Sequence, residues 1–437
     1  MSPIASSMLE QEARSLYTRL ARLRPFALIE PMVPAAALLP SAQSAIESYL
    51  VQGRRELHAM LAGFMEWLAG AHASATAAEG QRRFVFLRLR FNATLTQFDL
   101  FNNVITQRSE TENGVWLSGL DAVAADALDL PDAYYRAPPV ICYLDRGPGA
   151  AIRRARTRLP GGGDNPVAII RVPRERMVGS GLASSLIHEV GHQGAALLDL
   201  VNTLRAALQV MQQRDPARAE VWTLWERWIS EIVADFWSLA RVGVVATLGL
   251  MGVVSLPRVF VFRLNADDPH PIPWIRVILS CAMGRALYPH AQWDRIATAW
   301  EDFYPSATLE PETRDLLERL RESMPDFVRL LIGHRPPALR GRSLPEVLGV
   351  AQRQPAQLLR LYRNWERIPA HMYRAPPSLV FAVLGQARSN GLVDPEDENI
   401  VLAKLLSHWA LRSTLDISYQ CANLARSGAA ANPFEVH

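Results

Sequence analysis

His188 and His192 lie four positions apart in a segment whose apolar residues recur at helical spacing. Ser180 is the predicted N-cap of this helix, which is expected to continue past Gln212. Residues four apart project from the same face of an α-helix, so both imidazoles can bind one metal ion. Glu189 is rotated by about 100° from the first histidine, which lets it miss the metal and reach a metal-bound water. The segment therefore predicts a helix that presents two metal ligands and a base.

A second helical segment supplies a candidate for the third ligand. Asp215-Pro216 predicts its start, with the aspartate as N-cap and the proline at the first helical position. Glu231 lies 39 residues after the second histidine, which is enough chain for the first helix to end and the next to return antiparallel. Asp235 is one turn later, where its carboxylate can accept the free N–H of a ligand histidine and fix the ring orientation. The neighbouring residues are mostly apolar, and acids on such a helix need partners.

Other interpretations of the two segments remain open at this point. Two histidines at this spacing can be hydrogen-bonded residues of a helical core. Glu231 and Asp235 can be ordinary acids on the polar face of a helix. The four residues have to be close together in space before a metal site follows.

The motifs HEVGH at 188–192 and EIVAD at 231–235 together resemble the gluzincin class of zinc metallopeptidases, in which HExxH is followed by ExxxD on the next helix. The segment DDPHP at 267–271, followed by Arg276, is similar to the HP…R element of one subgroup. That subgroup contains the CAAX-prenyl and heat-shock-induced membrane endopeptidases, which carry membrane spans. The resemblance covers about residues 165–280.

The resemblance implies a zinc metalloendopeptidase that hydrolyses peptide bonds with a zinc-activated water. It implies the following roles: Zn²⁺ ligands His188, His192 and Glu231, general base Glu189, ligand-orienting Asp235, and His270 and Arg276 in contact with the substrate or the developing oxyanion. Apart from the resemblance, Tyr288 and His290 are reserve candidates for the donor to the oxyanion. The implied partner is a peptide or protein substrate, which adds to an edge strand at 166–173 that lines the cleft.

The same residues are also compatible with two alternatives to a soluble peptidase. The first is a binding or scaffold protein, or a latent protease, that keeps the zincin fold and the metal without turnover; the long flanking regions offer surface for partners. Glu189 favours the enzyme, because a purely structural metal site does not need it. The second is a peripheral membrane enzyme that uses the segment 242–262.

The expected fold class is predominantly α with a small β-sheet (α+β). It consists of a zincin-like metallopeptidase core with N- and C-terminal helical extensions. The expected domains are an N-terminal helical region at 1–80, the core at 81–300 and a C-terminal helical region at 301–437. Within the core we expect the sheet part at 81–175 and the active-site helices at 180–300.

Several local patterns underlie that expectation. Alternating apolar residues at 82–98 predict a strand or hairpin, and short apolar runs at 138–144 and 166–172 predict two more strands. Helical periodicity is expected at 45–73 and at 119–130.

The composition of the chain bears on its order, its partners and its location. Hydrophobic residues make up 49% and charged residues 20% of the chain, which excludes general disorder. A net charge of +3 does not demand a nucleic-acid partner, and the arginines at 153–158 are expected on a solvated face.

The apolar stretch between Arg241 and Arg258 is shorter than the roughly 20 residues of a membrane span, and predicts a buried core helix. The first residues lack a signal-peptide pattern, and three cysteines without CxxC spacing favour a reducing, cytoplasmic location.

Overall fold

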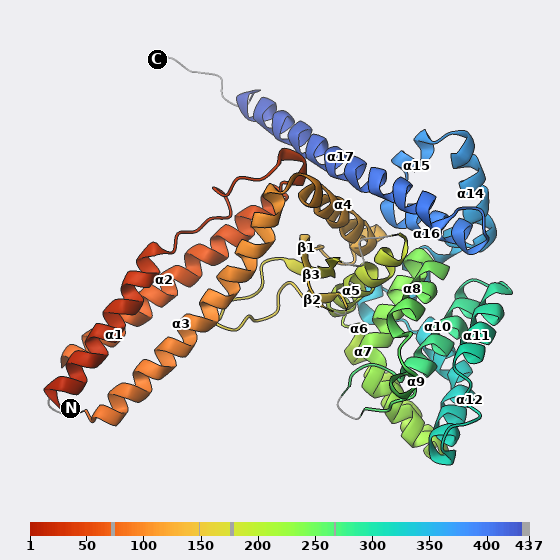
Figure 1. Cartoon of the computed structure of the whole chain (residues 1–437), viewed down its shortest axis with the longest axis horizontal. Helices are drawn as coiled ribbons and strands as arrows, with labels where there is room; N and C mark the ends of the chain where they lie inside the picture. The colour runs from red at the N-terminus through yellow and green to blue at the C-terminus, as the bar shows by residue number, and fades with distance from the viewer. Residues whose placement is uncertain (71–74, 148, 175–178, 266–267, 431–437) are drawn as a thin grey trace.

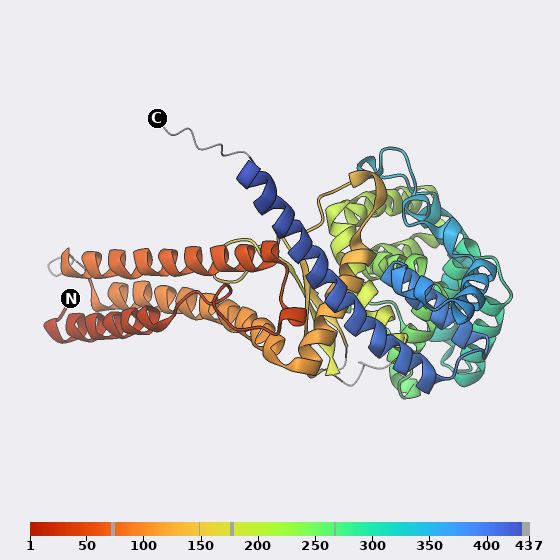
Figure 2. The ribbon, with the colours of Figure 1, turned by 90° about the horizontal axis from the view of Figure 1, so that it is seen from above.

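The structure is a computed structural model that describes residues 1–70, 75–147, 149–174, 179–265 and 268–430. A three-helix arm projects from a larger helical body, and a small sheet lies where the two meet (Figures 1 and 2). Most described residues are helical, and the sheet has three strands. The predicted class, predominantly α with a small β-sheet, is therefore confirmed. The domain boundaries and the zincin-like core stay predictions.

The arm consists of α1 (Pro3–Arg22), α2 (Pro40–Gly70) and α3 (Ala77–Thr106). The prediction of a strand or hairpin at 82–98 is wrong, because these residues lie within α3. Phe84, Leu87 and Phe91 are buried at helical spacing against apolar residues of α1 and α2, whereas Leu89 is exposed. Apolar residues occur at so many positions here that they fit both periods, and the neighbouring helices favour the helical one.

The sheet contains β1 (Val140–Asp145), β2 (Ala151–Arg153) and β3 (Ala168–Pro173), in the order β1-β3-β2. β1 pairs parallel with β3, and β2 pairs antiparallel with it. The strands predicted at 138–144 and 166–172 are confirmed. The expectation that 166–173 forms an edge strand is wrong, because β3 is central, and β1 and the three-residue β2 form the two edges. A strand as short as β2 carries too few residues to show an alternating pattern.

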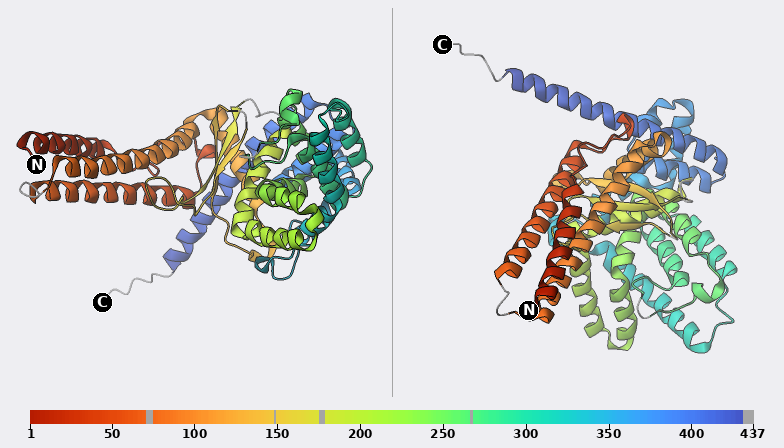
Figure 3. Two further views of the ribbon diagram at one scale, coloured as in Figure 1. Left: turned by 90° about the horizontal axis from the view of Figure 1, so that it is seen from below. Right: turned by 60° about the vertical axis from the view of Figure 1, so that its left-hand side comes forward.

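Each face of the sheet packs against different helices. Cys142 and Ile170 face the main hydrophobic cluster, which includes residues of α4 (Thr111–Leu128) and α5 (Gly181–Leu197). Ile141 and Ile169, on the opposite face, pack with residues of α2 and α3. The sheet thus joins the arm to the body, as a further view shows (Figure 3).

Twelve further α-helices build the rest of the described body: α6 (Leu200–Arg214), α7 (Ala219–Val242), α8 (Val244–Val254), α9 (Arg258–Val261), α10 (Pro273–Leu287), α11 (Gln292–Phe303), α12 (Pro311–Gly333), α13 (Leu344–Val347), α14 (Pro355–Arg367), α15 (Ala370–Arg374), α16 (Pro377–Ser389) and α17 (Pro395–Ala430). Residue 300 is the predicted boundary between the core and the C-terminal region. Helices before and after this boundary contribute to the main hydrophobic cluster. α17, the last described helix, packs against α4.

Two predicted helices differ from the structure in detail. The helix expected from Ser180 past Gln212 is broken after Leu197, where Asp199 adopts a left-handed conformation with φ 53°. Asp215 does not cap the next helix, because its carboxylate instead accepts hydrogen bonds from Arg218 and Trp222. Neither difference changes the parts of α5 and α7 that carry the motifs.

The apolar stretch at 241–258 is not one buried helix. Gly243, at φ 61°, separates α7 from the short α8, and Leu248 on α8 is exposed. In the described parts of the chain, no helix combines the length and the apolar character that crossing a membrane requires.

Close packing of α5 on α7 positions the two motifs. A Cβ atom on Gly191 would lie 2.9 Å from the Cα of Ala234 and 2.9 Å from the Cβ of Trp237. One on Gly194 would lie 2.5 Å from the indole ring of Trp237. The two glycines therefore let the helix backbones approach more closely than side chains would allow.

We expect Gly191→Ala to lower the free energy of unfolding by about 1–3 kcal/mol, because the added methyl group must push the helices apart. Gly252→Ala is the matched control, since Gly252 lies in α8 with open space around it. In the control, the higher helix propensity of alanine should raise stability by up to about 1 kcal/mol. Urea unfolding followed by circular dichroism measures both. Equal effects in the two variants would contradict the close-packing explanation.

Candidate metal centre

His188 and His192 on α5 converge with Glu231 on α7. The Nε2 atom of His188 lies 3.3 Å from Oε2 of Glu231, and Nε2 of His192 lies 3.4 Å from Oε1. One ligand atom from each of the three residues lies within 4.8 Å of the others, so the group can hold a metal ion. The helices run antiparallel, as predicted, since His188 also contacts Asp235, one turn after Glu231.

The donor atoms of this group fit a cation. Nδ1 of His188 is 2.8 Å from Oδ1 of Asp235. When Nδ1 carries the proton for this hydrogen bond, Nε2 keeps its lone pair, and that lone pair faces the Glu231 carboxylate. Oε2 of Glu231 is buried and accepts no hydrogen bond of good geometry. Acceptors that face one another in a buried site require a positive charge between them.

The pKa values of His188 and Glu231 also indicate a site that attracts positive charge. Burial lowers the pKa of His188, but the hydrogen bond with Asp235 and the contact with the Glu231 carboxylate outweigh it and raise the pKa to about 9. Burial raises the pKa of Glu231, but its contacts with the three histidines His188, His192 and His270 hold it far below the usual range. The site therefore keeps its carboxylate ionised and attracts positive charge.

Asp235 is held by a buried arginine behind the first histidine. Nε of Arg276 donates to Oδ2 of Asp235 at 2.7 Å, and Nη2 donates to Oδ1 at 2.8 Å. Burial raises the pKa of Asp235, but the Arg276 charge and the bond to His188 bring it down to about 2. Asp235 therefore makes the predicted contact with His188, whose role as a metal ligand stays a prediction. Arg276 uses two of its N–H groups on Asp235, so it orients the carboxylate that orients the ring.

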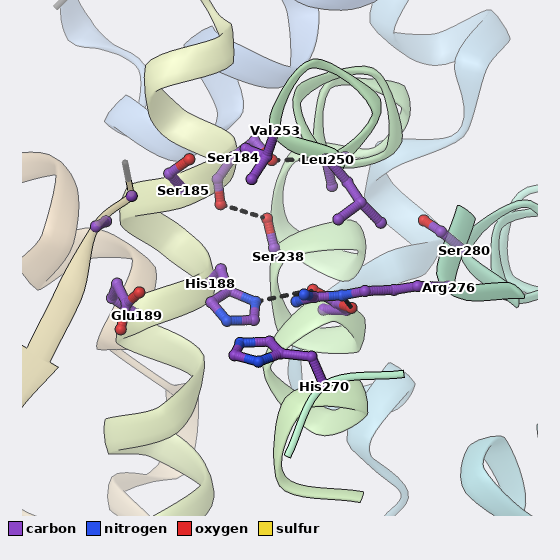
Figure 4. Close-up of a pocket in the computed structure, with 14 residues that line it drawn as sticks. Ser184, Ser185, His188, Glu189, Ser238, Leu250, Val253, His270, Arg276 and Ser280 are labelled. Atoms are coloured by element: carbon purple, nitrogen blue, oxygen red, sulfur yellow. Dashed lines mark hydrogen bonds and ion pairs between the residues drawn. The ribbon is translucent and has the colours of Figure 1, made fainter. Parts of the chain in front are cut away.

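Glu189, the residue after His188 on α5, lines a cavity of about 160 Å³ together with that histidine (Figure 4). The residue is buried, at 8% exposure. Burial raises its pKa, while the neighbouring histidines act in the opposite direction. A carboxylate with a raised pKa is a stronger base at neutral pH than an ordinary glutamate.

His270 also reaches the site, from the loop before α10. Its Nε2 lies 3.1 Å from Oε2 of Glu231, and its Nδ1 lies 2.6 Å from Oδ1 of Asp268. The two reserve candidates lie elsewhere. Tyr288 is buried and donates to the carbonyl of Ala240, and the exposed His290 does not line the cavity.

The sequence motifs did not indicate the rest of the cavity wall. Gly149 and Ala150, just before the edge strand β2, form one side. α8 contributes Ala246, Leu250 and Val253 on another side. None of these residues belongs to a motif. Those of α8 lie in the apolar stretch that predicts a core helix, and the other two lie in a loop. The sequence therefore contains no signal that they line a cavity.

Comparisons with known family models, curated proteins and solved structures find no match for this chain. The resemblance to gluzincins therefore depends on the motifs and on the geometry of the site.

We expect Asp235→Asn to weaken metal binding about 10- to 100-fold, because the amide no longer holds His188 in one tautomer. Isothermal titration with Zn²⁺, in parent and variant, measures the change. Asp302→Asn is the control, as Asp302 is exposed on α11 and away from the site. Unchanged affinity in Asp235→Asn would show that the carboxylate does not support a metal ligand.

Proposed function

We propose that this chain is a zinc-dependent metallopeptidase that cleaves peptide bonds within a polypeptide. The observation that carries the proposal is Glu189, a buried carboxylate beside a group of two histidines and a glutamate that can hold a metal, at the wall of an open cavity. A site with only a structural metal has no use for such a base. A bound Zn²⁺ supplies Lewis acidity that makes a water molecule acidic enough to lose its proton near neutral pH.

Glu189 is the proton acceptor in this proposal. Its raised pKa lets it take a proton from the attacking water and later deliver it to the leaving amine. His270 is the group that donates a hydrogen bond to the developing oxyanion, because it lines the same cavity and is partly exposed. Arg276 is a positioning residue, since it acts through Asp235 and His188.

The edge of the sheet suits an extended substrate. β2 pairs with β3 on one side only, and no described strand lies on its other side. The loop before β2 lines the cavity. A peptide that adds to this edge through main-chain hydrogen bonds would pass beside Glu189.

A second candidate function is a latent protease or scaffold, and the position of His270 favours it. Its Nε2 is 3.1 Å from the Glu231 carboxylate, close enough for His270 to occupy the fourth metal position and close the site. His270→Ala separates the two functions. The variant loses activity if His270 stabilises the oxyanion, and gains activity if His270 blocks the metal.

We expect Glu189→Gln to lower the rate of peptide cleavage about 10²- to 10⁴-fold, while the protein keeps one zinc per chain. The glutamine has nearly the same shape but cannot accept the proton. The measurement combines metal analysis of the purified protein with cleavage of an unbiased peptide library. Chelation of the metal should abolish the parent activity as well. A Glu189→Gln protein that cleaves as fast as the parent would exclude Glu189 as the base.

A further inference from the structure

Positive charge is concentrated in one segment of the chain. Residues 136–174 contain eight arginines and two aspartates, a net charge of +6, whereas the whole chain carries +3. The rest of the protein is therefore net negative. This segment, called the arginine segment below, comprises Arg136, Arg146, Arg153, Arg154, Arg156, Arg158, Arg171 and Arg174 and the residues between them.

The arginine segment borders the cavity of the metal centre. It contains all three strands and the loops that join them. Gly149 and Ala150, within this segment, line the same cavity as His188 and Glu189. Any polypeptide that reaches the cavity along β2 therefore runs past the arginines.

The charges of the segment are available to a partner. Seven of its arginines are exposed, and Arg171 is half-buried. Among the described residues, none of the eight forms an ion pair with a carboxylate. Those with side-chain hydrogen bonds use neutral acceptors, such as the Gln97 amide for Arg153 and the carbonyl of Gly149 for Arg171.

Arginines elsewhere in the molecule are often paired. Arg108 is buried against Asp121, and Arg276 is held by Asp235. Exposed arginines such as Arg321 and Arg342 also form ion pairs. A group of like charges that has no carboxylate partner among the described residues creates a positive potential that attracts an anionic molecule.

We propose that the arginine segment binds carboxylate-rich stretches of the substrate, so that this protein acts on acidic polypeptides. This inference rests on the proposed function. Guanidinium groups bind carboxylates with two parallel hydrogen bonds, which gives specificity as well as charge. The positive potential also speeds the encounter with an acidic chain and aligns it with the edge strand.

A single-stranded nucleic acid is the other common anionic partner, and the segment suits it less well. Proteins that bind such strands stack the bases on exposed aromatic rings. The only aromatic residue between 136 and 174 is Tyr143, which is buried.

Binding of labelled peptides by the full-length, zinc-loaded Glu189→Gln protein tests the inference. The probes are a fluorescein-labelled glutamate-rich peptide, the same peptide with glutamine at each glutamate, and a single-stranded DNA of the same length. The variant combines Arg146→Gln, Arg154→Gln and Arg158→Gln, three exposed arginines whose side chains have no partner in the described parts of the chain. The control combines Arg360→Gln, Arg363→Gln and Arg367→Gln, which remove the same charge from exposed positions on α14.

We expect the acidic peptide to bind more tightly than the neutral one, and more weakly as salt increases. The segment variant should bind the acidic peptide about tenfold less tightly, with the neutral peptide and the control variant unchanged. Equal affinity for the two peptides, or an equal loss in the control, would overturn the inference. Tighter binding of the DNA than of the acidic peptide would assign the segment to nucleic acid and overturn it as well.

Cleavage by the parent protein separates this inference from the proposed function. If acidic peptides bind to the segment but no peptide is cleaved, the peptidase proposal fails and the arginine segment stands. If neutral library peptides are cleaved as fast as acidic ones, the peptidase proposal stands and the preference for acidic substrates fails.

Discussion

The close contact between α5 and α7 is the constraint on which the metal centre depends. Gly191 and Gly194 bring the α5 backbone against Ala234 and Trp237 of α7. At this separation the Glu231 carboxylate meets the imidazoles of α5, at contacts of 3.3 and 3.4 Å. Bulkier residues at the two glycines would widen the gap and separate ligands that lie on different helices.

Behind the ligands, each buried charge has a partner that holds it in place. Arg276 donates two hydrogen bonds to Asp235, and Asp235 accepts one from His188. Burial alone would favour neutral forms of these groups, but each charge offsets the cost of burying the next. The series leaves Glu231 as the ionised group that faces His188 and His192, where a cation fits.

The two halves of the proposed cleft come from different parts of the fold. The α5–α7 pair provides the residues that can hold a metal ion and the proposed base, and the sheet provides an edge with a strongly positive segment. The arm packs through α2 and α3 on one face of the sheet, and the body packs on the other face. The sheet is therefore held between them. A polypeptide drawn to the arginines would thus meet a rigid edge beside the cavity.

The sequence by itself determined the residues of the metal centre, because helical spacing places His188 and His192 on one face and Asp235 one turn beyond Glu231. It also determined β1 and β3, whose apolar runs are bounded by turns. It could not separate helix from strand in α3, where apolar residues are frequent enough to satisfy both periods. Only the tertiary structure decided that β3 is central with β2 at one edge, that Asp235 holds Arg276, and that α8 lines the cavity. Those features depend on contacts between segments far apart in the chain, and local periodicity carries no information about them.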